Sequence, residues 1–250
     1  MKNNCSTNQF LATAKEHYDN HLGAIYSWMV GDFQKKSSEF VQFLQTNGVS
    51  PNYNRIAIDL GEGNGIQSVA MAEMGFEVKS FEFNQYLLKE LKENSKYWQI
   101  EIFEENLENF HTFLPEAELI VCCGDTISHL FSMNDITKLI MNIHKVLCKN
   151  GRIILSFRDY FQELKGKDRF IEVKSDKDRI LTCFLEYDHN FVNVTDILYE
   201  RVNDIWEQKI STYPKVRIFT FDIVALLEEV SFTIEFNQIF NGLTTIIAIK

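Results

Sequence analysis

The segment Asp59-Leu60-Gly61-Glu62-Gly63-Asn64-Gly65 combines an acid with three glycines that are spaced two residues apart. Glycine allows positive φ and lets a ligand approach the main chain closely. An apolar run precedes this segment and a helical pattern follows it, so the free N–H groups of a helix N-terminus would face a ligand there. The pattern predicts a ligand-binding turn at the tip of a strand.

The spacing of the glycines separates two kinds of nucleotide site. A dinucleotide fingerprint has the form G-x-G-x-x-G/A, and counted from Gly61 its third small residue would be Ile66. The third glycine here is Gly65, which disfavours a nicotinamide dehydrogenase. A second acid, Glu82, lies about twenty residues beyond the loop, where a carboxylate can hydrogen-bond ribose hydroxyls. We therefore expect a nucleoside ligand without a pyrophosphate, with Phe83 packed on its base.

The elements that must position these residues alternate along the chain. The expected strands are 55–60, 78–82, 98–103, 118–123 and 152–157, and the expected helices between them are 65–75, 86–95 and 135–148. Such alternation predicts parallel β-α-β units. It is typical of an α/β protein with a Rossmann-like, mostly parallel sheet.

The flanking segments have other patterns. Apolar residues recur at helical spacing over 8–47, with a break at Gly31-Asp32. Extended runs at 179–188 and 191–202, with 205–211 beside them, suggest an antiparallel insert, and a helix at 221–230 precedes a closing antiparallel pair at 234–240 and 244–249. We expect a helical cap at 1–50, a core at 51–160, a β insert or lid at 161–220, and the C-terminal helix and closing strands of the core at 221–250.

Charge and hydropathy limit the partners. The chain of 250 residues has a formal net charge of −10 and no basic run, whereas a nucleic-acid binder needs Lys and Arg to displace counterions. No apolar stretch is long enough to span a bilayer, and residues 1–10 lack the apolar run of a secretory signal. We therefore expect a cytoplasmic protein with a small-molecule substrate and no nucleic-acid or membrane partner. The sequence leaves homo-oligomerisation open.

The cysteines and histidines do not suggest a metal site. The chain has an odd number of cysteines and no C-x-x-C pair: Cys5, Cys122, Cys123, Cys148 and Cys183. A disulfide framework or a zinc site is therefore not expected. His17 and His21 are four residues apart and could share a helix face, but no third ligand lies near them in the sequence.

Several further segments carry a family resemblance. They are Trp28–Asp32, Asn106-Leu107, Cys123–Leu130, Phe157–Tyr160 and Ser211–Pro214. Together with the glycine loop, and in this order, they resemble the glycine N-methyltransferase-like branch of the class I S-adenosylmethionine-dependent methyltransferases. The resemblance implies a Rossmann-like class I methyltransferase sheet and an N-terminal segment that folds over the cofactor.

The resemblance also implies that the cofactor is S-adenosylmethionine and that its product is S-adenosylhomocysteine. The residues that would bind it are Tyr18, Lys36, Asp59, Gly61, Gly63, Gly65, Glu82, Phe83, Asn106, Leu107 and Cys123. In this arrangement Tyr18 and Lys36 lie near the carboxylate of the cofactor, Glu82 holds the ribose, and the Asn106-Leu107 pair flanks the adenine. The three glycines line the methionine end.

Four residues are candidates for the acceptor side: Asp125, His129, Arg158 and Tyr213. The resemblance implies that Arg158 meets a substrate carboxylate, although an internal ion pair is an alternative. Asp125 or His129 could take the proton of an amine. The alternatives are that Asp125 caps a turn, that His129 hydrogen-bonds its own loop, and that Tyr213 packs in the core.

The expected reaction is methyl transfer to a small-molecule amine, either an amino acid or a similar carboxylated metabolite. Asp125 stands where the family usually has Asn, and an acid there favours a cationic acceptor; this and the other departures, at Met29 and Thr212, disfavour glycine itself. The alternatives are an O- or S-methyltransferase of a small metabolite and a non-catalytic S-adenosylmethionine-binding protein.

Overall fold

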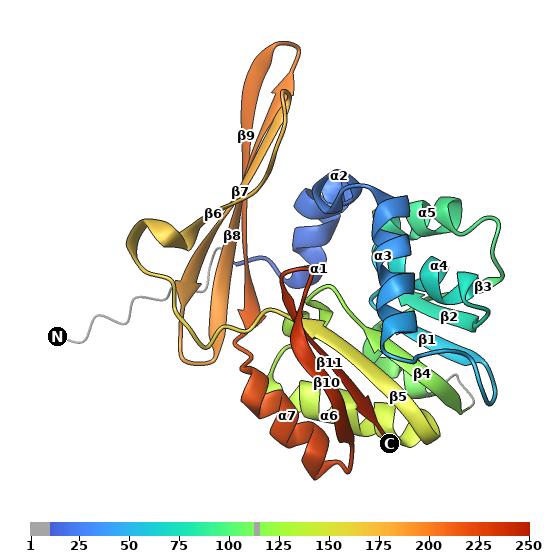
Figure 1. The fold of residues 1–250 in the computed structure, drawn as a ribbon. Coiled ribbons are helices and arrows are strands. Elements are labelled where there is room, and N and C mark those ends of the chain that lie inside the picture. Colours follow the sequence, from blue (N-terminus) through green and yellow to red (C-terminus); the bar gives the residue numbers. More distant parts are fainter. Residues whose placement is uncertain (1–10, 113–115) are drawn as a thin grey trace.

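The computed structural model describes residues 11–112 and 116–250, so Cys5 and the start of the expected 8–47 helix lie outside the described residues. Its main element is a seven-stranded sheet in the order β10-β11-β5-β4-β1-β2-β3 (Figure 1). The strands are β1 Ile56–Leu60, β2 Glu77–Glu82, β3 Ile100–Glu104, β4 Ala117–Cys122, β5 Leu147–Phe157, β10 Thr233–Phe240 and β11 Leu243–Ile249. Strands β1 to β5 are parallel, whereas β11 and β10 are antiparallel additions at the edge. The predicted Rossmann-like sheet with an antiparallel closing strand is confirmed.

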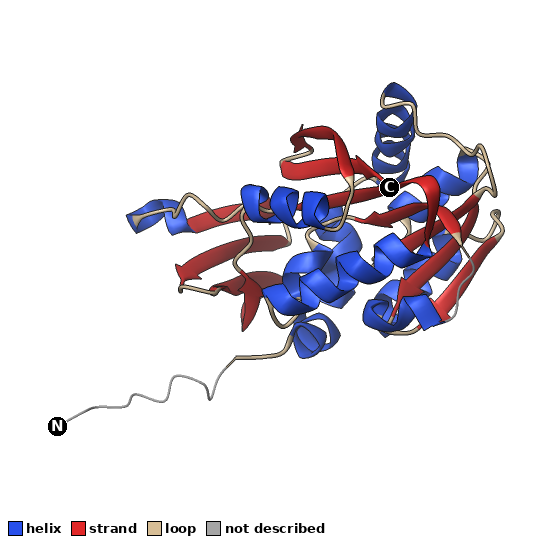
Figure 2. Cartoon of the chain, turned by 90° about the horizontal axis from the view of Figure 1, so that it is seen from below, coloured by secondary structure: helices blue, strands red, loops and turns tan. Residues whose placement is uncertain are grey.

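Apolar side chains cover both faces of the sheet, which is why its central strands are nearly continuous apolar runs. One core cluster includes residues of α6 (Met133–Val146) and α7 (Thr220–Glu229). The other includes residues of α3 (Phe33–Thr46) and α4 (Ile66–Glu73). A further helix, α5 (Gln85–Asn94), follows β2. Its N-cap residue is Asn84, whose side chain accepts hydrogen bonds from two N–H groups of the first turn. Figure 2 shows the helices on both sides of the sheet.

Helix α6 ends before the position that the sequence predicts. It stops at Val146 instead of residue 148, and Leu147 already pairs with Ala117 at the start of β5. Asn150 has a φ of 64°, which bends the chain within β5. Leu147 and Cys148 are buried, so apolar periodicity alone could not distinguish the end of a helix from the start of a strand.

The N-terminal segment is helical but irregular. It consists of α1 (Ala14–His17), the π-helix η1 (Tyr18–Leu22), the 3₁₀-helix η2 (Gly23–Ile25) and α2 (Tyr26–Val30). The segment is attached to two different parts of the protein. His17 hydrogen-bonds residues of a second sheet, and Asp19 accepts a hydrogen bond from Asn84, which follows β2, at 2.8 Å. These two attachments favour a break in the regular helix that the sequence predicts over this stretch.

The second sheet is formed by β6 (Phe170–Ser175), β7 (Arg179–Tyr187), β8 (Phe191–Val202) and β9 (Ile205–Val216), all antiparallel and in that order. We call it the insert sheet; it stands beside the main sheet in Figure 1. Strand β6 was not predicted, and β9 continues five residues beyond the expected 205–211 run. The short 3₁₀-helices η3 (Leu107–Thr112), η4 (Thr126–His129) and η5 (Gly166–Arg169) follow β3, follow β4 and precede β6. No helix in residues 11–112 and 116–250 is both long and apolar enough to cross a bilayer.

The end of β5 is tied to the start of α7 by Asp159. Phe219, the N-cap residue of α7, makes no side-chain cap. The Asp159 carboxylate instead accepts hydrogen bonds from the Thr220 N–H at 3.1 Å and from the Thr220 hydroxyl at 2.5 Å, and its other oxygen accepts one from the Phe161 N–H at 2.7 Å. An acid from a different element therefore supplies the missing cap.

We expect Asp159→Ala to lower the free energy of unfolding by about 1–2 kcal/mol, because a helix cap and hydrogen bonds to a charged group are lost together. Urea denaturation monitored by circular dichroism would measure this. Asp159→Asn keeps an acceptor oxygen and should retain part of the stability. An Ala variant as stable as the wild type would contradict this account of the α7 N-terminus.

Candidate active site

Two cavities meet at the carboxyl ends of the parallel strands. The first, with a volume of about 570 Å³, lies beside the end of β2, and the second, of about 610 Å³, lies under the insert sheet. We call them the β2 cavity and the insert cavity. Both are lined by Tyr18, Tyr26, Gly61, Gly124 and His129. Ligands that occupy the two cavities would therefore meet within this ring of residues.

Glu82 lies at the polar end of the β2 cavity. Its Oε1 accepts hydrogen bonds from the N–H groups of Phe83 and Asn84, both at 2.8 Å, and its Oε2 accepts one from the Gly63 N–H at 3.1 Å. Burial raises the pKa of Glu82, and these three backbone donors act in the opposite direction. A carboxylate offers about four acceptor directions, so this geometry leaves room on Oε2 for a ligand hydroxyl.

The other end of the β2 cavity has the residues expected around a base. Phe83, Asn106 and Leu107 all line it. The Asn106 side chain is held within its own loop, since its Oδ1 accepts the Glu108 N–H at 3.1 Å and its Nδ2 donates to the Glu108 carboxylate at 3.0 Å. The structure thus brings Glu82 and these three residues together around one cavity, as the sequence predicts.

The three glycines of the loop have different surroundings. A Cβ on Gly61 would lie 2.4 Å from the Thr126 methyl group, and one on Gly63 would lie 2.9 Å from the Tyr26 hydroxyl, and both glycines have positive φ. These two line the cavities. Gly65 does not, because it faces Leu91 of α5, 2.9 Å from where its Cβ would stand. The prediction that Gly65 lines the methionine end is therefore not supported by its position.

A cluster of carboxylates lies behind the loop. The Ser68 hydroxyl contacts both Asp59 and Glu62, at 2.8 Å from Asp59 Oδ2. Burial raises the pKa of Asp59 to about 7, and burial together with the Asp59 charge raises the pKa of Glu62 well above its usual value. Glu62 lines the insert cavity, whereas Asp59 lines neither cavity. Asp59 would therefore act on a ligand only through Glu62.

Two buried oxygen atoms of the glycine loop have no hydrogen-bond partner within the described residues. They are Glu62 Oε1 and Asn64 Oδ1, and both residues line the insert cavity. A buried polar atom without a partner is costly. Asn64 Oδ1 is an acceptor, and Glu62 Oε1 is an acceptor whenever the carboxyl is ionised. The geometry therefore fits a ligand group with several N–H donors, such as an ammonium.

Asp125 and Lys215 form a buried ion pair between the two sheets. Lys215 Nζ is 2.6 Å from Asp125 Oδ2, and Asp125 Oδ1 accepts the Arg158 N–H at 2.9 Å. Burial by itself would raise the pKa of Asp125, but the Lys215 charge and His129 hold it below its usual value. Both Asp125 oxygens are engaged, so it is an ionised anchor in this structure and does not cap its own 3₁₀-turn with a side-chain bond.

His129 is neutral and has a free ring nitrogen. Burial, with the nearby Lys215 charge, lowers its pKa to about 3. Its ring stacks on Tyr213 with centroids 5.7 Å apart and lies edge-on to Tyr18 at 5.5 Å. Its buried Nδ1 has no hydrogen-bond partner in the described chain, so the alternative that the ring hydrogen-bonds its own loop finds no support at that atom.

The insert sheet supplies the far wall of the insert cavity. Tyr213 lies there between His129 and His17, whose ring stacks on it at 3.9 Å. Asp196 also lines the cavity and accepts from His17 Nε2 at 3.1 Å, while His17 Nδ1 contacts the Ser211 hydroxyl at 2.8 Å. Both ring nitrogens of His17 are therefore occupied by protein groups.

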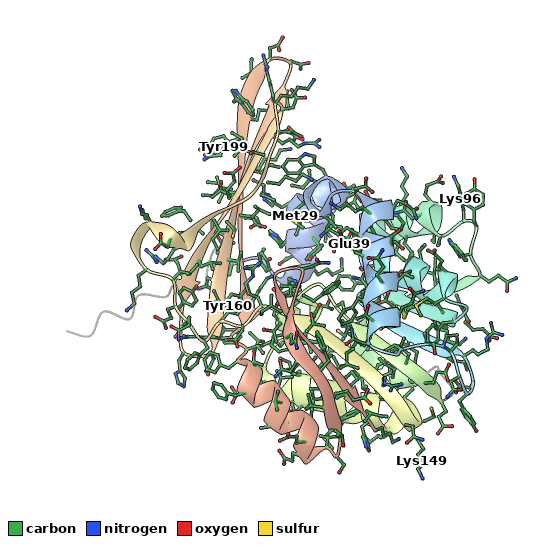
Figure 3. All side chains as sticks on the ribbon, viewed as in Figure 1. Met29, Glu39, Lys96, Lys149, Tyr160 and Tyr199 are labelled. Atoms are coloured by element: carbon green, nitrogen blue, oxygen red, sulfur yellow. The ribbon has the colours of Figure 1, made fainter. Side chains whose placement is uncertain are left out.

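The remaining predicted residues also line the insert cavity. The Arg158 side chain is exposed, and no ion pair with an acid of the described chain is formed by it. Lys36 also lines the cavity, and its Nζ lies 3.9 Å from the Glu39 carboxylate. Cys123 lines it as well, and burial raises the pKa of its thiol to about 12, which keeps the thiol neutral. Met29 of α2 and Tyr160, which follows β5, also line this cavity and are labelled in Figure 3.

Sequence reasoning did not assign Tyr26, Asp196, Lys215 or the loop residues Glu62 and Asn64 to the site, although all five line the insert cavity. Lys215 could have been found, because it lies two residues after Tyr213, and side chains two apart in a strand share a face. The run 205–211 was expected to end before it. Tyr26 and Asp196 carry no local signal, since neighbours far away in the sequence place them.

Parts of the chain are similar in sequence to known proteins. The family described as Methyltransferase domain matches residues 57–151. A glycine/sarcosine N-methyltransferase of Aphanothece halophytica is 26% identical over 155 residues, which are 58% of this chain and 57% of the relative. The chain thus spans little more than half the length of this curated relative.

Solved structures resemble nearly the whole chain. CalS10, an amino pentose methyltransferase from Micromonospora echinaspora solved with bound SAM, has a TM-score of 0.73 at 10% identity, covering 90% of this chain and 94% of its own. KedS8, a sugar N-methyltransferase from Streptoalloteichus, has a TM-score of 0.73 at 10% identity, covering 98% and 97%. At such identities the likeness shows the fold alone.

The buried ion pair gives a test of how the site is held together. We expect Lys215→Met to lower the free energy of unfolding by about 3–5 kcal/mol, because it leaves Asp125 buried without its partner. The double variant Lys215→Met/Asp125→Asn should lose less than the sum of the two single variants, as measured by urea denaturation. Strict additivity would contradict a direct coupling.

The same pair predicts a pH dependence. The folded pKa of Asp125 lies below its unfolded value, so its contribution to stability is present above an unfolded pKa of about 3.9 and is lost as pH falls through the lower folded value. We expect the wild type to lose more stability than Asp125→Asn on acidification through this range. Equal losses would show that the pair does not contribute in this way.

Proposed function

We propose that this chain is a class I S-adenosylmethionine-dependent methyltransferase and that it transfers a methyl group from S-adenosylmethionine to an amine nitrogen of a small molecule. The observation that carries the proposal is the junction of two cavities at Tyr18, Tyr26 and His129. One cavity suits the nucleoside of the cofactor, and the other is large enough for a metabolite.

The residues present fit the cofactor. Glu82 would accept a ribose hydroxyl, and the adenine would lie among Phe83, Asn106 and Leu107. Glu62 lines the insert cavity and its Oε1 has no partner in the described chain, so the ammonium of the methionine end would supply its missing donor. Burial and the Asp59 charge raise the pKa of Glu62, and a bound cation would favour its ionised form.

When bound, S-adenosylmethionine supplies an electrophilic methyl group on a sulfonium. The protein must align the acceptor lone pair with the S–CH₃ bond and exclude water. The half-buried rings of Tyr18, Tyr26 and His129 line both cavities at their junction and limit the access of water to it. Burial raises the pKa of Tyr26 to about 12, so its hydroxyl stays protonated and available as a hydrogen-bond donor.

The amine must be neutral when it attacks. His129 has a free Nδ1 at the junction, but a pKa of about 3 makes it a weak base. Its role is therefore to accept a hydrogen bond from the amine N–H and so orient the lone pair, and not to store the proton. Asp125, whose oxygens are taken by Lys215 and the Arg158 N–H, fixes this wall of the cavity.

The other end of the acceptor would meet Arg158. Arg158 lines the insert cavity, and its guanidinium has the planar fork that matches a carboxylate. Tyr213, stacked on His129, would contact the body of the acceptor. A carboxylated amine would thus have a partner at each end, and an amine substrate also agrees with the names of the relatives, a glycine/sarcosine and a sugar N-methyltransferase.

Turnover of labelled S-adenosylmethionine with a panel of amines, alcohols and thiols tests the proposal. We expect transfer to carboxylated amines. Transfer only to alcohols or thiols would support an O- or S-methyltransferase instead, and binding of S-adenosylhomocysteine without transfer to any acceptor would support a non-catalytic binding protein.

We expect Glu82→Gln to raise the Kd for S-adenosylhomocysteine by about tenfold or more, since a hydrogen bond to a charged group contributes roughly 1.5–3 kcal/mol. Isothermal titration calorimetry would measure it. Glu93→Gln, which changes an exposed acid near the end of α5 and outside both cavities, serves as the matched control. Equal affinities for all three proteins would exclude the ribose role.

We expect His129→Phe to lower kcat by about tenfold, the effect of one lost hydrogen bond, while the affinity for S-adenosylhomocysteine changes little. Phe keeps the ring that stacks on Tyr213 but removes the acceptor nitrogen. His129→Gln, which restores an acceptor, should recover part of kcat, and His144→Gln on α6 is the control. A Phe variant with the wild-type kcat would rule out the orienting role.

A further inference from the structure

Strand β9 leaves an open edge at the end of the insert sheet. It is the last strand of that sheet, and no strand within residues 11–112 and 116–250 pairs with its outer side. The Ala12 N–H donates to the Thr212 carbonyl at 2.9 Å, so that carbonyl points away from β8. The register between β8 and β9 is unbroken from Ile205 to Val216. The main-chain groups of Trp206, Gln208 and Ile210 therefore also point to the open edge.

The side chains along this edge are unusually apolar for an exposed strand. Ile205, Trp206 and Ile210 are 68%, 47% and 58% exposed. Tyr199 of β8 lies opposite Gln208 and is also exposed, and Figure 3 shows it on the side of the sheet away from α2. Natural edge strands are commonly protected by bulges, prolines, charged side chains or short length. From Ile205 to Ser211 this edge has no bulge and no proline, and its two charged residues, Glu207 and Lys209, have opposite signs.

The sequence of the edge is complementary to itself. In an antiparallel pair of two β9 strands centred on Gln208, Trp206 lies opposite Ile210, and Glu207 lies opposite Lys209 of the other copy. The first is an aromatic–β-branched pair and the second an opposite-charge pair, both of which stabilise neighbouring strands. Two-fold symmetry repeats each pair.

The main-chain geometry supports the same centre. Gln208 and the residues two positions away point their N–H and C=O groups outward, so each opposed pair would exchange both hydrogen bonds. Glu207 and Lys209 then fall at the closer, non-hydrogen-bonded positions, where their side chains can meet. Lys209 already contacts Glu200 of its own chain at 3.1 Å, which holds its ammonium on that face of the sheet.

From these observations we propose that the outer edge of β9 binds a second copy of this chain, by antiparallel pairing of the two β9 strands around Gln208. The product is a two-fold symmetric dimer in which the two insert sheets form one continuous sheet. Because the pairing uses only the edge, the face of each insert sheet that carries Tyr213 and Lys215 remains free to line the insert cavity.

Sedimentation equilibrium of the full chain over a wide concentration series tests the proposal. The wild type should be a dimer, and a wild type that stays monomeric throughout would overturn it. Glu207→Lys and Lys209→Glu each place like charges opposite each other at two sites, so each should raise the dimer dissociation constant by about tenfold or more.

Mixing these two variants gives a decisive control. A mixed dimer has opposite charges at both positions, so the equimolar mixture should recover the wild-type dissociation constant. If both variants are folded by circular dichroism and the mixture does not recover, the proposed register is wrong.

A main-chain test is independent of charge. Gln208→Pro removes an N–H that points outward, away from β8, and should abolish the dimer, whereas Gln208→Ala keeps the N–H and should preserve it. A dimeric Pro variant would overturn the proposal. So would a dimer that disappears on removal of residues 1–10, because the N-terminal segment would then be the element that joins the copies.

Discussion

The ion pair between Asp125 and Lys215 is the contact on which the site depends. It joins the end of β4 in the main sheet to β9 in the insert sheet, and both groups are removed from water. Two such charges persist only where geometry and further hydrogen bonds compensate for lost hydration. The Arg158 N–H provides one of these bonds. The pair therefore fixes the position of the insert sheet over the cavity.

The charge of Lys215 also sets the protonation of its neighbours. Burial and this cation together keep His129 neutral, and the same cation keeps Asp125 ionised. On the other side of the junction, Asp59 and Glu62 are crowded carboxyl groups with raised pKa values. Under the proposed function, a cationic cofactor would bind beside these groups and favour their ionised form, and the neutral imidazole would face the nucleophilic nitrogen.

The two sheets have separate tasks. The main sheet presents the glycine loop and Glu82 at the carboxyl ends of parallel strands, an arrangement that many activities share. The insert sheet contributes Asp196, Tyr213 and Lys215 to the insert cavity, so under the proposed function the choice of acceptor would depend on it. Its β9 edge is a long, regular strand with exposed Ile205, Trp206 and Ile210, and pairing there would brace the wall that these side chains form.

The sequence by itself determined the α/β alternation, the glycine loop and the distance to Glu82, because the periodicity of apolar residues and the backbone freedom of glycine are local properties. It did not determine that Gly65 packs on α5 and that Asp59 lies behind the cavity, since which face of a turn meets a ligand depends on the neighbouring helix. The pairing of Asp125 with Lys215, 90 positions apart, was decided only by the tertiary structure. Strand register and burial bring such groups together and shift their pKa values, and no local pattern encodes either effect.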